Sequence, residues 1–322
     1  MNPPNNQSSA SISVVVPSYN HAPFIEKTLR SVLNQTQRPL ELIVIDDGSH
    51  DDSPQIIERT LKNCSMRCEL IVRGNKGLCA TLNEGLARTK GDFFAYLGSD
   101  DVWLPTFLEA RLKLLETRPA AVLAYGNAYS IDESNNVLDC TCDWAPYTDG
   151  NAQEGLFARG LAPLSPTVVY RRAPLARHGW NEASKLEDYE LYLRLSADGE
   201  FAFDPQVLSA WRVHSYNTSR DLEFMATEWL AAQSRVGTRI GLDSRRLAAL
   251  QTSLKWKCAE DFMRAGQKRR ALDLVLHNMR GAPSGASVAR LLAGLLIPHS
   301  IRQRRRLIMQ QQARKRYAHV KI

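Results

Sequence analysis

The feature that most constrains the fold is an alternation of short apolar runs with stretches of helical spacing in the first 125 residues. The runs at residues 12–16, 40–45, 69–72 and 93–97 are rich in branched or aromatic side chains, as buried strands are. Between the runs, apolar residues recur three or four positions apart, which is typical of a helix packed along one face. This pattern predicts a doubly wound, mostly parallel sheet with helices on both faces.

The alternation weakens beyond residue 130. Residues 132–149 are polar and rich in Asn and Asp, so we expect a loop or lid there. From residue 221 onward the chain is expected to be helical, with a hairpin of two helices about Gly266. Before residue 221 we also expect strands at 121–125, 201–203 and 207–211 and a helix at 187–197.

The net charge of +7 is distributed unevenly along the 322 residues. Residues 300–322 carry eight Arg and Lys side chains and no acid, so the rest of the chain is close to neutral. A nucleic-acid-binding domain would be basic throughout, so no nucleic acid partner is expected. The apolar run before this tail makes residues 288–322 a candidate for binding an anionic membrane surface. A packed terminal helix with a solvated basic face explains the same pattern equally well.

The sequence predicts neither secretion nor a membrane span. Its polar N-terminus lacks the basic start and apolar middle of a signal peptide. The apolar stretch at residues 291–298 is much shorter than the roughly 20 residues that cross a bilayer. We therefore expect a cytoplasmic protein, with peripheral attachment to the inner face of the membrane left open. The cysteines, expected as free thiols in a reducing compartment, are Cys64, Cys68, Cys79, Cys140, Cys142 and Cys258.

Polar motifs follow the four predicted strands at the points where the strands end. They are Pro-Ser-Tyr-Asn at 17–20, Asp-Asp-Gly-Ser at 46–49, Asn-Lys-Gly at 75–77 and Gly-Ser-Asp-Asp at 98–101. The carboxyl ends of parallel strands line one crevice, where ligands bind. An aromatic ring there can stack on a nucleobase, and carboxylates can hold Mg²⁺ or Mn²⁺. Taken singly, each motif is also explained as a turn or a helix cap.

As a set, these motifs resemble those of the inverting glycosyltransferases of family 2, which have the GT-A fold. The segment Ser-Val-Leu-Asn-Gln-Thr at 31–36 adds to the resemblance, which covers about residues 11–220. It implies a nucleotide-diphosphate sugar donor, usually UDP- or dTDP-linked, and a divalent cation, Mn²⁺ or Mg²⁺. It also implies transfer with inversion to a glycan or lipid-linked acceptor, in the synthesis of a cell-surface polysaccharide or lipopolysaccharide.

The resemblance assigns the donor site to residues at the ends of the first four strands. These nucleotide-sugar-binding residues are Pro17, Tyr19, Asp47, Asn75, Gly77 and Ser99. Asp100 matches the acid that binds the metal. The chain departs from the family where Gly98 replaces the first Asp of the tetrad and where Leu82 replaces a phosphate-facing Arg. Lys76 or Arg73 would then supply the charge facing the phosphate.

Glu187 and Asp188, at the start of the expected helix, resemble the Glu-Asp pair of the family. In that pair the Asp takes the proton from the acceptor hydroxyl, which is a poor nucleophile until the proton is removed. Asp188 is therefore the predicted catalytic base, and Glu187 is predicted to orient it or to touch the acceptor. Without the upstream motifs, the pair would be explained as acids that favour a helix N-terminus.

The segment Trp-Arg-Val-His at 211–214 resembles the Arg-X-His segment that approaches the diphosphate in the family. His214 is predicted to be a metal ligand or a diphosphate donor, and Arg212 to neutralise phosphate charge. With these assignments, we expect a disordered N-terminus at 1–10, a GT-A domain at 11–220 and a helical region at 221–322. The GT-A domain would divide into a nucleotide-binding half, 11–125, and an acceptor or catalytic half, 126–220.

Two other functions stay open on the sequence alone. A nucleotidyltransferase also uses a nucleotide-binding fold and a carboxylate-bound metal, but it usually carries a Gly-rich, basic loop after its first strand. Residues 17–20 do not form such a loop. A non-catalytic sugar-nucleotide or glycan-binding protein is the second alternative, because Gly98 and Leu82 depart from the family pattern. Turnover of a donor separates an enzyme from this alternative.

Overall fold

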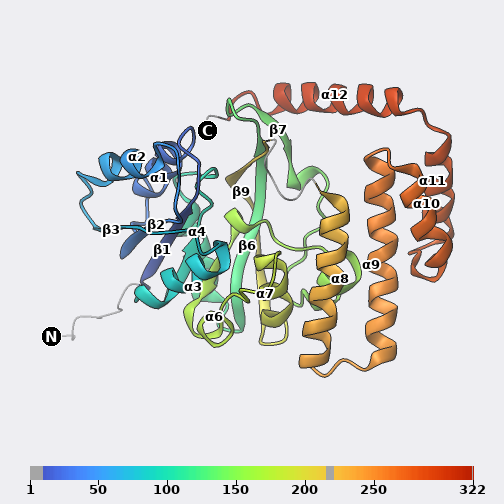
Figure 1. Cartoon of the computed structure of the whole chain (residues 1–322), viewed down its shortest axis with the longest axis horizontal. Coiled ribbons are helices and arrows are strands. Elements are labelled where there is room, and N and C mark those ends of the chain that lie inside the picture. The colour runs from blue at the N-terminus through green and yellow to red at the C-terminus, as the bar shows by residue number, and fades with distance from the viewer. Residues whose placement is uncertain (1–9, 215–220, 321) are drawn as a thin grey trace.

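The computed structural model describes residues 10–214, 221–320 and 322. Their strands form one nine-stranded sheet in the order β3-β2-β1-β4-β8-β6-β9-β5, with β7 paired to β6. The sheet and the helices that cover it fill one end of the molecule, and helices α8 to α11 stand at the other end (Figure 1). This arrangement confirms the predicted α/β fold with a helical C-terminal region. The expected disorder of the N-terminus falls mostly on residues 1–9, outside the described residues.

The first half of the sheet is parallel. β1 (Ile12–Ser18) pairs with β2 (Glu41–Asp46) on one side and β4 (Phe93–Tyr96) on the other. β2 also pairs with β3 (Arg67–Val72). The helices that connect these strands are α1 (Ile25–Leu33), α2 (Ser53–Leu61) and α3 (Leu78–Arg88). The alternation predicted from the sequence is therefore confirmed for this half of the sheet.

The second half of the sheet is mixed. β6 (Ala121–Ile131) and β9 (Glu200–Arg212) are parallel to each other, while β8 (Val169–Arg171) runs antiparallel between β4 and β6. Two further antiparallel strands, β5 (Val102–Trp103) and β7 (Val137–Cys140), pair with β9 and β6. Parallel pairing is thus confined to β1 to β4 and to the β6–β9 pair.

Alternation along β1 divides the core into two layers. Val14 and Val16 pack into the cluster on one face of the sheet, and Val15 packs into the cluster on the other face. Helices α1, α2 and α4 (Phe107–Thr117) cover the first face. The second face is covered by α3 together with α5 (Gln153–Arg159), α6 (Arg172–His178) and α7 (Glu187–Leu195).

Two expectations for the second half are corrected by the structure. The two strands expected at 201–203 and 207–211 are one strand, β9, whose register against β6 shifts near Asn127. The stretch 132–149 is not a plain loop, because it contains β7, a short helix η1 (Thr141–Asp143) and the buried residues Val137 and Cys140. The polar residues on either side hid β7, a strand of only four residues that pairs with β6.

The C-terminal region is helical, as predicted, and has a core of its own. Large buried side chains of this core include Trp256 and Phe262 on α9. The helices are α8 (Leu222–Arg239), α9 (Ser244–Arg264), α10 (Lys268–His277), α11 (Gly285–Leu296) and α12 (His299–Arg316), with short helices η2 (Ser165–Thr167) and η4 (Met279–Gly281) elsewhere. Gly266, at φ 84°, turns the chain between α9 and α10, which confirms the expected hairpin. α12 runs from α11 back to β7 (Figure 1).

The expectation of free thiols is wrong for Cys64 and Cys68, which form a disulfide. The chain turns back between the end of α2 and the start of β3, and this turn brings the two Cα atoms to 6.5 Å. That separation lies within the range that a disulfide can bridge. The free cysteines among the described residues are Cys79, Cys140, Cys142 and Cys258.

Replacing Leu29 tests the packing of α1 on the sheet. Leu29 is fully buried, so Leu29→Ala leaves a cavity and is expected to lower the free energy of unfolding by about 2–5 kcal/mol. Leu40→Ala is the control, because the Leu40 side chain is 50% exposed and its loss should cost less than about 1 kcal/mol. Chemical denaturation followed by circular dichroism measures both changes. Equal losses for the two variants would contradict this packing.

Candidate active site

The structure brings the four polar motifs together at the carboxyl edge of the parallel strands. β1 and β2 end side by side because Ser18 is paired with Asp46, and β3 ends beside them because Val72 is also paired with Asp46. A hydrogen bond then joins the first two motifs, because the Asn20 N–H donates to Ser49 Oγ at 2.8 Å. The first three motifs therefore lie at one edge, and His21 Nδ1, 2.7 Å from Ser99 Oγ, joins the tetrad at 98–101 to the first of them.

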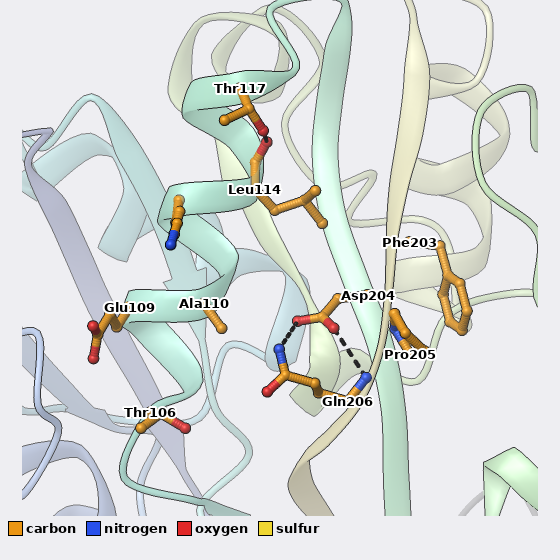
Figure 2. A pocket seen from close by; sticks show the side chains of 10 residues that line it. Thr106, Glu109, Ala110, Leu114, Thr117, Phe203, Asp204, Pro205 and Gln206 are labelled. Atoms are coloured by element: carbon orange, nitrogen blue, oxygen red, sulfur yellow. Dashed lines mark hydrogen bonds between the residues drawn. The ribbon is translucent and has the colours of Figure 1, made fainter.

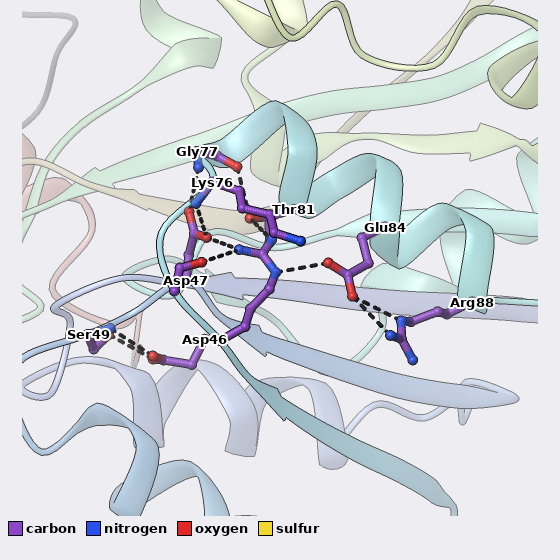
Figure 3. Close-up of polar contacts among 10 residues, drawn as sticks. Asp46, Asp47, Ser49, Lys76, Gly77, Thr81, Glu84 and Arg88 are labelled. Atoms are coloured by element: carbon purple, nitrogen blue, oxygen red, sulfur yellow. Dashed lines mark hydrogen bonds and ion pairs between the residues drawn. The ribbon is translucent and has the colours of Figure 1, made fainter.

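Asp47 is the centre of a polar cluster at the second and third motifs (Figure 3). Its carboxylate accepts the backbone N–H groups of Lys76 and Gly77, each at 2.8 Å. Arg73, at the end of β3, forms an ion pair with Asp47 and another with Glu84, whose Oε2 lies 2.9 Å from the Arg73 Nε. Asp47 is thus held in place with its carboxylate at the strand edge. From the sequence alone, Arg73 is expected only as a compensating charge for the phosphate, and the structure adds its ion pairs with Asp47 and Glu84.

Three other predicted donor-site residues differ in exposure. Tyr19 is 45% exposed and Asn75 is also exposed, so both present side chains at the edge. Pro17 is buried within β1 and contributes backbone shape. Gly48 allows these loops to approach, because a Cβ added there would lie 2.9 Å from the Asn75 backbone nitrogen and the residue has φ +84°.

The tetrad at 98–101 lies beside two histidines. His214 Nε2 is 2.9 Å from Asp100 Oδ2, and His21 Nδ1 is 3.9 Å from Asp100 Oδ1. One ligand atom from each of these three side chains lies within 4.8 Å of the other two. His21 Nδ1 also lies 2.7 Å from Ser99 Oγ, which fixes the orientation of the ring. The structure therefore brings together the predicted ligands, Asp100 and His214, and adds His21 to them.

This donor set fits a divalent cation. Two imidazole nitrogens and a carboxylate oxygen suit Mn²⁺ and other transition metals, whereas Mg²⁺ prefers oxygen ligands. Burial lowers the pKa of His21 despite the opposing charge of Asp100, which favours the neutral ring that a metal ligand needs. Sequence reasoning missed His21, although its position two residues after Tyr19 in the same strand-end loop was an available signal.

The second acid of the tetrad is enclosed by protein. Asp101 is 4% exposed, and its Oδ1 accepts the backbone N–H of Arg212 at 2.8 Å. Burial and the neighbouring Asp100 charge raise the pKa of Asp101. A Cβ at Gly98 would lie 3.0 Å from Asp100 Oδ1, so a larger residue there would require a small shift of the Asp100 side chain. Leu82, the other departure, is fully buried and contributes to the core.

Arg212 lies beneath the tetrad with only 1% of its surface exposed. Its Nε donates to the Asp100 carbonyl at 2.7 Å, and its Nη1 donates to the Asp132 carbonyl at 2.8 Å. The guanidinium also lies 4.7 Å from the centre of the Phe24 ring, which stacks on His214. This environment favours a positioning role for Arg212 over the direct phosphate contact that the sequence suggested. The rest of that motif, residues 215–219, lies outside the described residues.

Glu187 and Asp188 form the first turn of α7, as predicted. The Tyr189 N–H donates to Asp188 Oδ1 at 2.7 Å. Neighbouring atoms enclose both carboxyl groups although part of each residue reaches solvent, and this burial raises the pKa of both. The Asp188 charge raises the pKa of Glu187 further, because two adjacent carboxyl groups resist joint ionisation.

Two contacts place the start of α7 at the same edge of the sheet. Cys79, two residues after Gly77, has its Sγ 3.7 Å from the Ser184 carbonyl, just before α7. Tyr96, which ends β4 two residues before the tetrad, is buried in the same core as Leu186 and Tyr189. Burial raises the pKa of Tyr96, and the charges of Tyr170, Asp188 and Glu187 raise it further. The predicted base therefore lies on the side of the molecule where β4 ends.

Helix α8 braces α7 from behind. Gln233 donates to the Tyr189 hydroxyl at 2.9 Å, and Arg235 forms an ion pair with Glu190 at 2.7 Å. Ala232 and Val236 of α8 are buried in the same core as α7. The helical region therefore supports α7, the helix that carries the predicted base. The sequence pattern did not reveal this support.

A separate groove lies between α4 and β9 (Figure 2). It has a volume of about 550 Å³ and includes Glu109, Lys113, Asp204 and Gln206 in its lining. Asp204 accepts the Gln206 backbone N–H at 2.9 Å, so part of the polar lining is already paired. None of the predicted site residues lines this groove.

Comparison with known proteins identifies the class to which this site belongs. Residues 13–162 match the model of glycosyl transferase family 2. The matched region, which contains the four polar motifs, is therefore similar to the glycosyltransferases of this family.

Two relatives are similar over most of the same region. An uncharacterized glycosyltransferase of Rickettsia prowazekii, RP339, is 28% identical over 216 residues, which are 65% of each chain. A chondroitin synthase of Escherichia coli is 26% identical over 241 residues, covering 74% of this chain and 34% of that protein. This chain thus spans less than two thirds of the length of either relative.

Solved structures confirm the GT-A-like fold. A mannosyltransferase from Pyrobaculum calidifontis, in complex with GDP-Man and Mn²⁺, superposes with a TM-score of 0.62 at 18% identity, covering 95% of this chain and 87% of that one. Residues 1–349 of TarS from S. aureus, in complex with UDP-GlcNAc, give a TM-score of 0.60 at 15% identity over 96% and 92% of the two chains. Among the described residues, no helix is both long and apolar enough to cross a membrane.

Replacing His21 tests whether it belongs to the cation site. His21→Asn removes one imidazole ligand and is expected to weaken Mn²⁺ binding about 10–100-fold, as loss of a residue that supports a metal site typically does. Mg²⁺ binding should change less, because Mg²⁺ gains little from nitrogen ligands. Titration calorimetry with each ion measures both effects. His50→Asn is the matched control, because His50 is exposed in a neighbouring loop. Equal Mn²⁺ affinity in all three proteins would exclude His21 as a ligand.

Proposed function

We propose that this chain transfers a sugar from a nucleotide-diphosphate sugar to an acceptor hydroxyl, with inversion at the anomeric carbon. The observation that carries the proposal is the cluster of Asp100, His214 and His21 at the strand edge that also holds Asp47. The contact of Cys79 with the Ser184 carbonyl brings the carboxyl pair that begins α7 towards this edge. The match of residues 13–162 to the model of glycosyl transferase family 2 supports this class of reaction.

The nucleotide would bind at the ends of β1 to β3. The exposed ring of Tyr19 is available for stacking on the base, and the Asp47 carboxylate is suited to accept the N3–H of a uracil-type base. Asn75 and Gly77 would line the same pocket, and Ser99 would face the ribose. The UDP-GlcNAc complex of the similar TarS structure supports a UDP-linked donor, and dTDP offers the same base edge.

A divalent cation bound by Asp100, His214 and His21 would supply positive charge to the diphosphate as it leaves the sugar. Mn²⁺ fits these ligands best, and its presence in the similar mannosyltransferase complex supports this choice. In this scheme Arg212 keeps the Asp100 backbone in place through the hydrogen bond to its carbonyl.

Asp188 would accept the proton of the acceptor hydroxyl. Direct displacement with inversion needs a base on the side of the sugar opposite the leaving diphosphate. Glu187, whose pKa is raised by burial and by Asp188, would keep its proton and donate a hydrogen bond to the acceptor or to Asp188. Asp188 would thus act as the base and Glu187 as a hydrogen-bond donor.

The acceptor is proposed to be a glycan or a lipid-linked glycan of a cell-surface polysaccharide or lipopolysaccharide. The similarity to a protein named chondroitin synthase supports a glycan product. The cytoplasmic location expected from the sequence fits this role and remains a prediction.

Replacing Asp188 tests the reaction and its base together. Asp188→Asn keeps the size of the side chain but removes the base, so kcat is expected to fall about 10²–10⁴-fold. The readout is release of nucleoside diphosphate from a panel of nucleotide sugars with Mn²⁺ and hydroxyl acceptors. The rise in Tm on adding the donor should persist, because ligand that binds the folded state stabilises it. Glu116→Gln, at an exposed carboxylate of α4, should keep the full rate.

Two results of this assay would overturn the proposed function. Donor binding without turnover by the unmodified chain would indicate a sugar-nucleotide-binding protein. Release of pyrophosphate, with transfer of the nucleotide in place of the sugar, would indicate a nucleotidyltransferase.

The pH dependence of kcat provides a separate test of Asp188. A base works only when ionised, and burial raises the pKa of Asp188, so the rate should fall as pH decreases through a value above the ordinary Asp pKa of about 4. Mn²⁺ binding measured over the same pH range separates this effect from protonation of the histidine ligands. A rate that stays constant down to pH about 4, with Mn²⁺ still bound, would contradict the assignment.

A further inference from the structure

The outer face of α11 is apolar and uncovered by the described part of the chain. Leu291 and Gly294 face the core of the helical region and are buried. The opposite side of the helix presents Leu292, which is 45% exposed, and Leu296, which is 85% exposed. Ala289 and Ala293, on the same side of the helix, are also exposed, so this face offers no polar side chain to water.

The apolar surface continues around the corner between α11 and α12. Ile297 is 38% exposed and Ile301 is 57% exposed. We call Leu292, Leu296, Ile297 and Ile301 the apolar corner. In Figure 1 the corner lies at the end of the helical region farthest from the parallel strands, where α11 gives way to α12.

Positive charge surrounds the apolar corner. Arg290 is exposed on α11, and Arg304 and Arg305 are exposed one turn after Ile301 on α12. No acidic residue occurs after Asp273, so nothing in this part of the sequence neutralises them. Among the described residues, none of these three arginines has an acidic partner. Exposed leucines and isoleucines beside uncompensated arginines are the composition of a helix that lies in a membrane interface.

The rest of α12 does not cover its own apolar side chains. The helix is anchored at its far end, where Arg314 pairs with Asp132 at 3.0 Å and Tyr317 is buried beside Tyr129. Before that anchor, Leu307, Ile308 and Met309 are all at least 45% exposed. A helix packed against its own protein would bury such residues. The alternative of a packed terminal helix therefore does not account for most of α12.

We propose that the apolar corner and the arginines around it form a docking surface for an anionic lipid bilayer. The leucines and isoleucines enter the headgroup region while Arg290, Arg304 and Arg305 pair with lipid phosphates. A second copy of the chain fits less well, because a symmetric contact would bring two basic surfaces of the same sign together. The proposal goes beyond the proposed function and does not depend on it.

Flotation with lipid vesicles tests the docking surface on the full chain. Vesicles of phosphatidylcholine with about a third phosphatidylglycerol should carry the protein at about 0.1 M salt, and the bound fraction should fall at about 0.5 M salt because screening weakens the charge attraction. The double variant Leu292→Glu/Leu296→Glu is expected to bind at least about tenfold less, because it places charge in the apolar face. Arg304→Gln/Arg305→Gln should bind several-fold less and show a weaker dependence on salt.

Leu40→Glu is the matched control, because Leu40 is an exposed leucine of the α/β region and is 50% exposed. This variant should float as the unmodified chain does. Donor turnover without vesicles should be unchanged in every variant, so failure of the proposed enzymatic function is measured separately from failure of docking. Circular dichroism confirms that each variant is folded.

Three outcomes would overturn the docking proposal. The first is equal flotation of the unmodified chain and Leu292→Glu/Leu296→Glu. The second is equal binding to vesicles of phosphatidylcholine alone, since the arginines would then contribute nothing. The third is a dimer in solution that Leu296→Glu dissociates, with no vesicle binding by the unmodified chain, because a second copy would then be the natural occupant.

Discussion

The position of β1 between two parallel neighbours is the constraint on which the rest of the structure depends. β1 is hydrogen-bonded to β2 on one side and to β4 on the other, so the loops that follow all three strands emerge at one edge. Along β1, Val14 and Val15 point to opposite faces of the sheet, and each packs into the core beneath one of the two layers of helices. The backbone that buries the core therefore also decides that Asp47 and Asp100 belong to one polar surface.

The second half of the chain reaches this edge through side-chain contacts. Arg212, at the end of β9, holds the tetrad from below through the Asp100 carbonyl, and its guanidinium lies against the ring of Phe24. Helix α7 is held from behind by α8, through Gln233 and Arg235. The candidate base thus depends on the helical region as well as on the sheet. The disulfide and the groove of Figure 2 stand apart from this network.

The fold and part of the site follow from local sequence patterns. Asp47 and Asp100 were predictable because each comes just after an apolar run, and the end of a parallel strand has a known place in the sheet. His21 was missed because it lies in a loop whose path depends on β2 and β4. β7 was missed because it has only four residues and lies in a polar stretch, and its pairing with β6 is not visible in the local pattern.

The sequence by itself determined the parallel half of the sheet, the helical C-terminal region and the kinds of side chain at the strand ends. Apolar periodicity and turn residues carry that information locally. Only the tertiary structure decided that Asp100 faces two histidines while its neighbour Asp101 is enclosed. The reason is that the surroundings of two adjacent carboxylates in one turn are set by residues far away in the sequence. Here Arg212, which covers Asp101, lies 111 positions away from it in the chain.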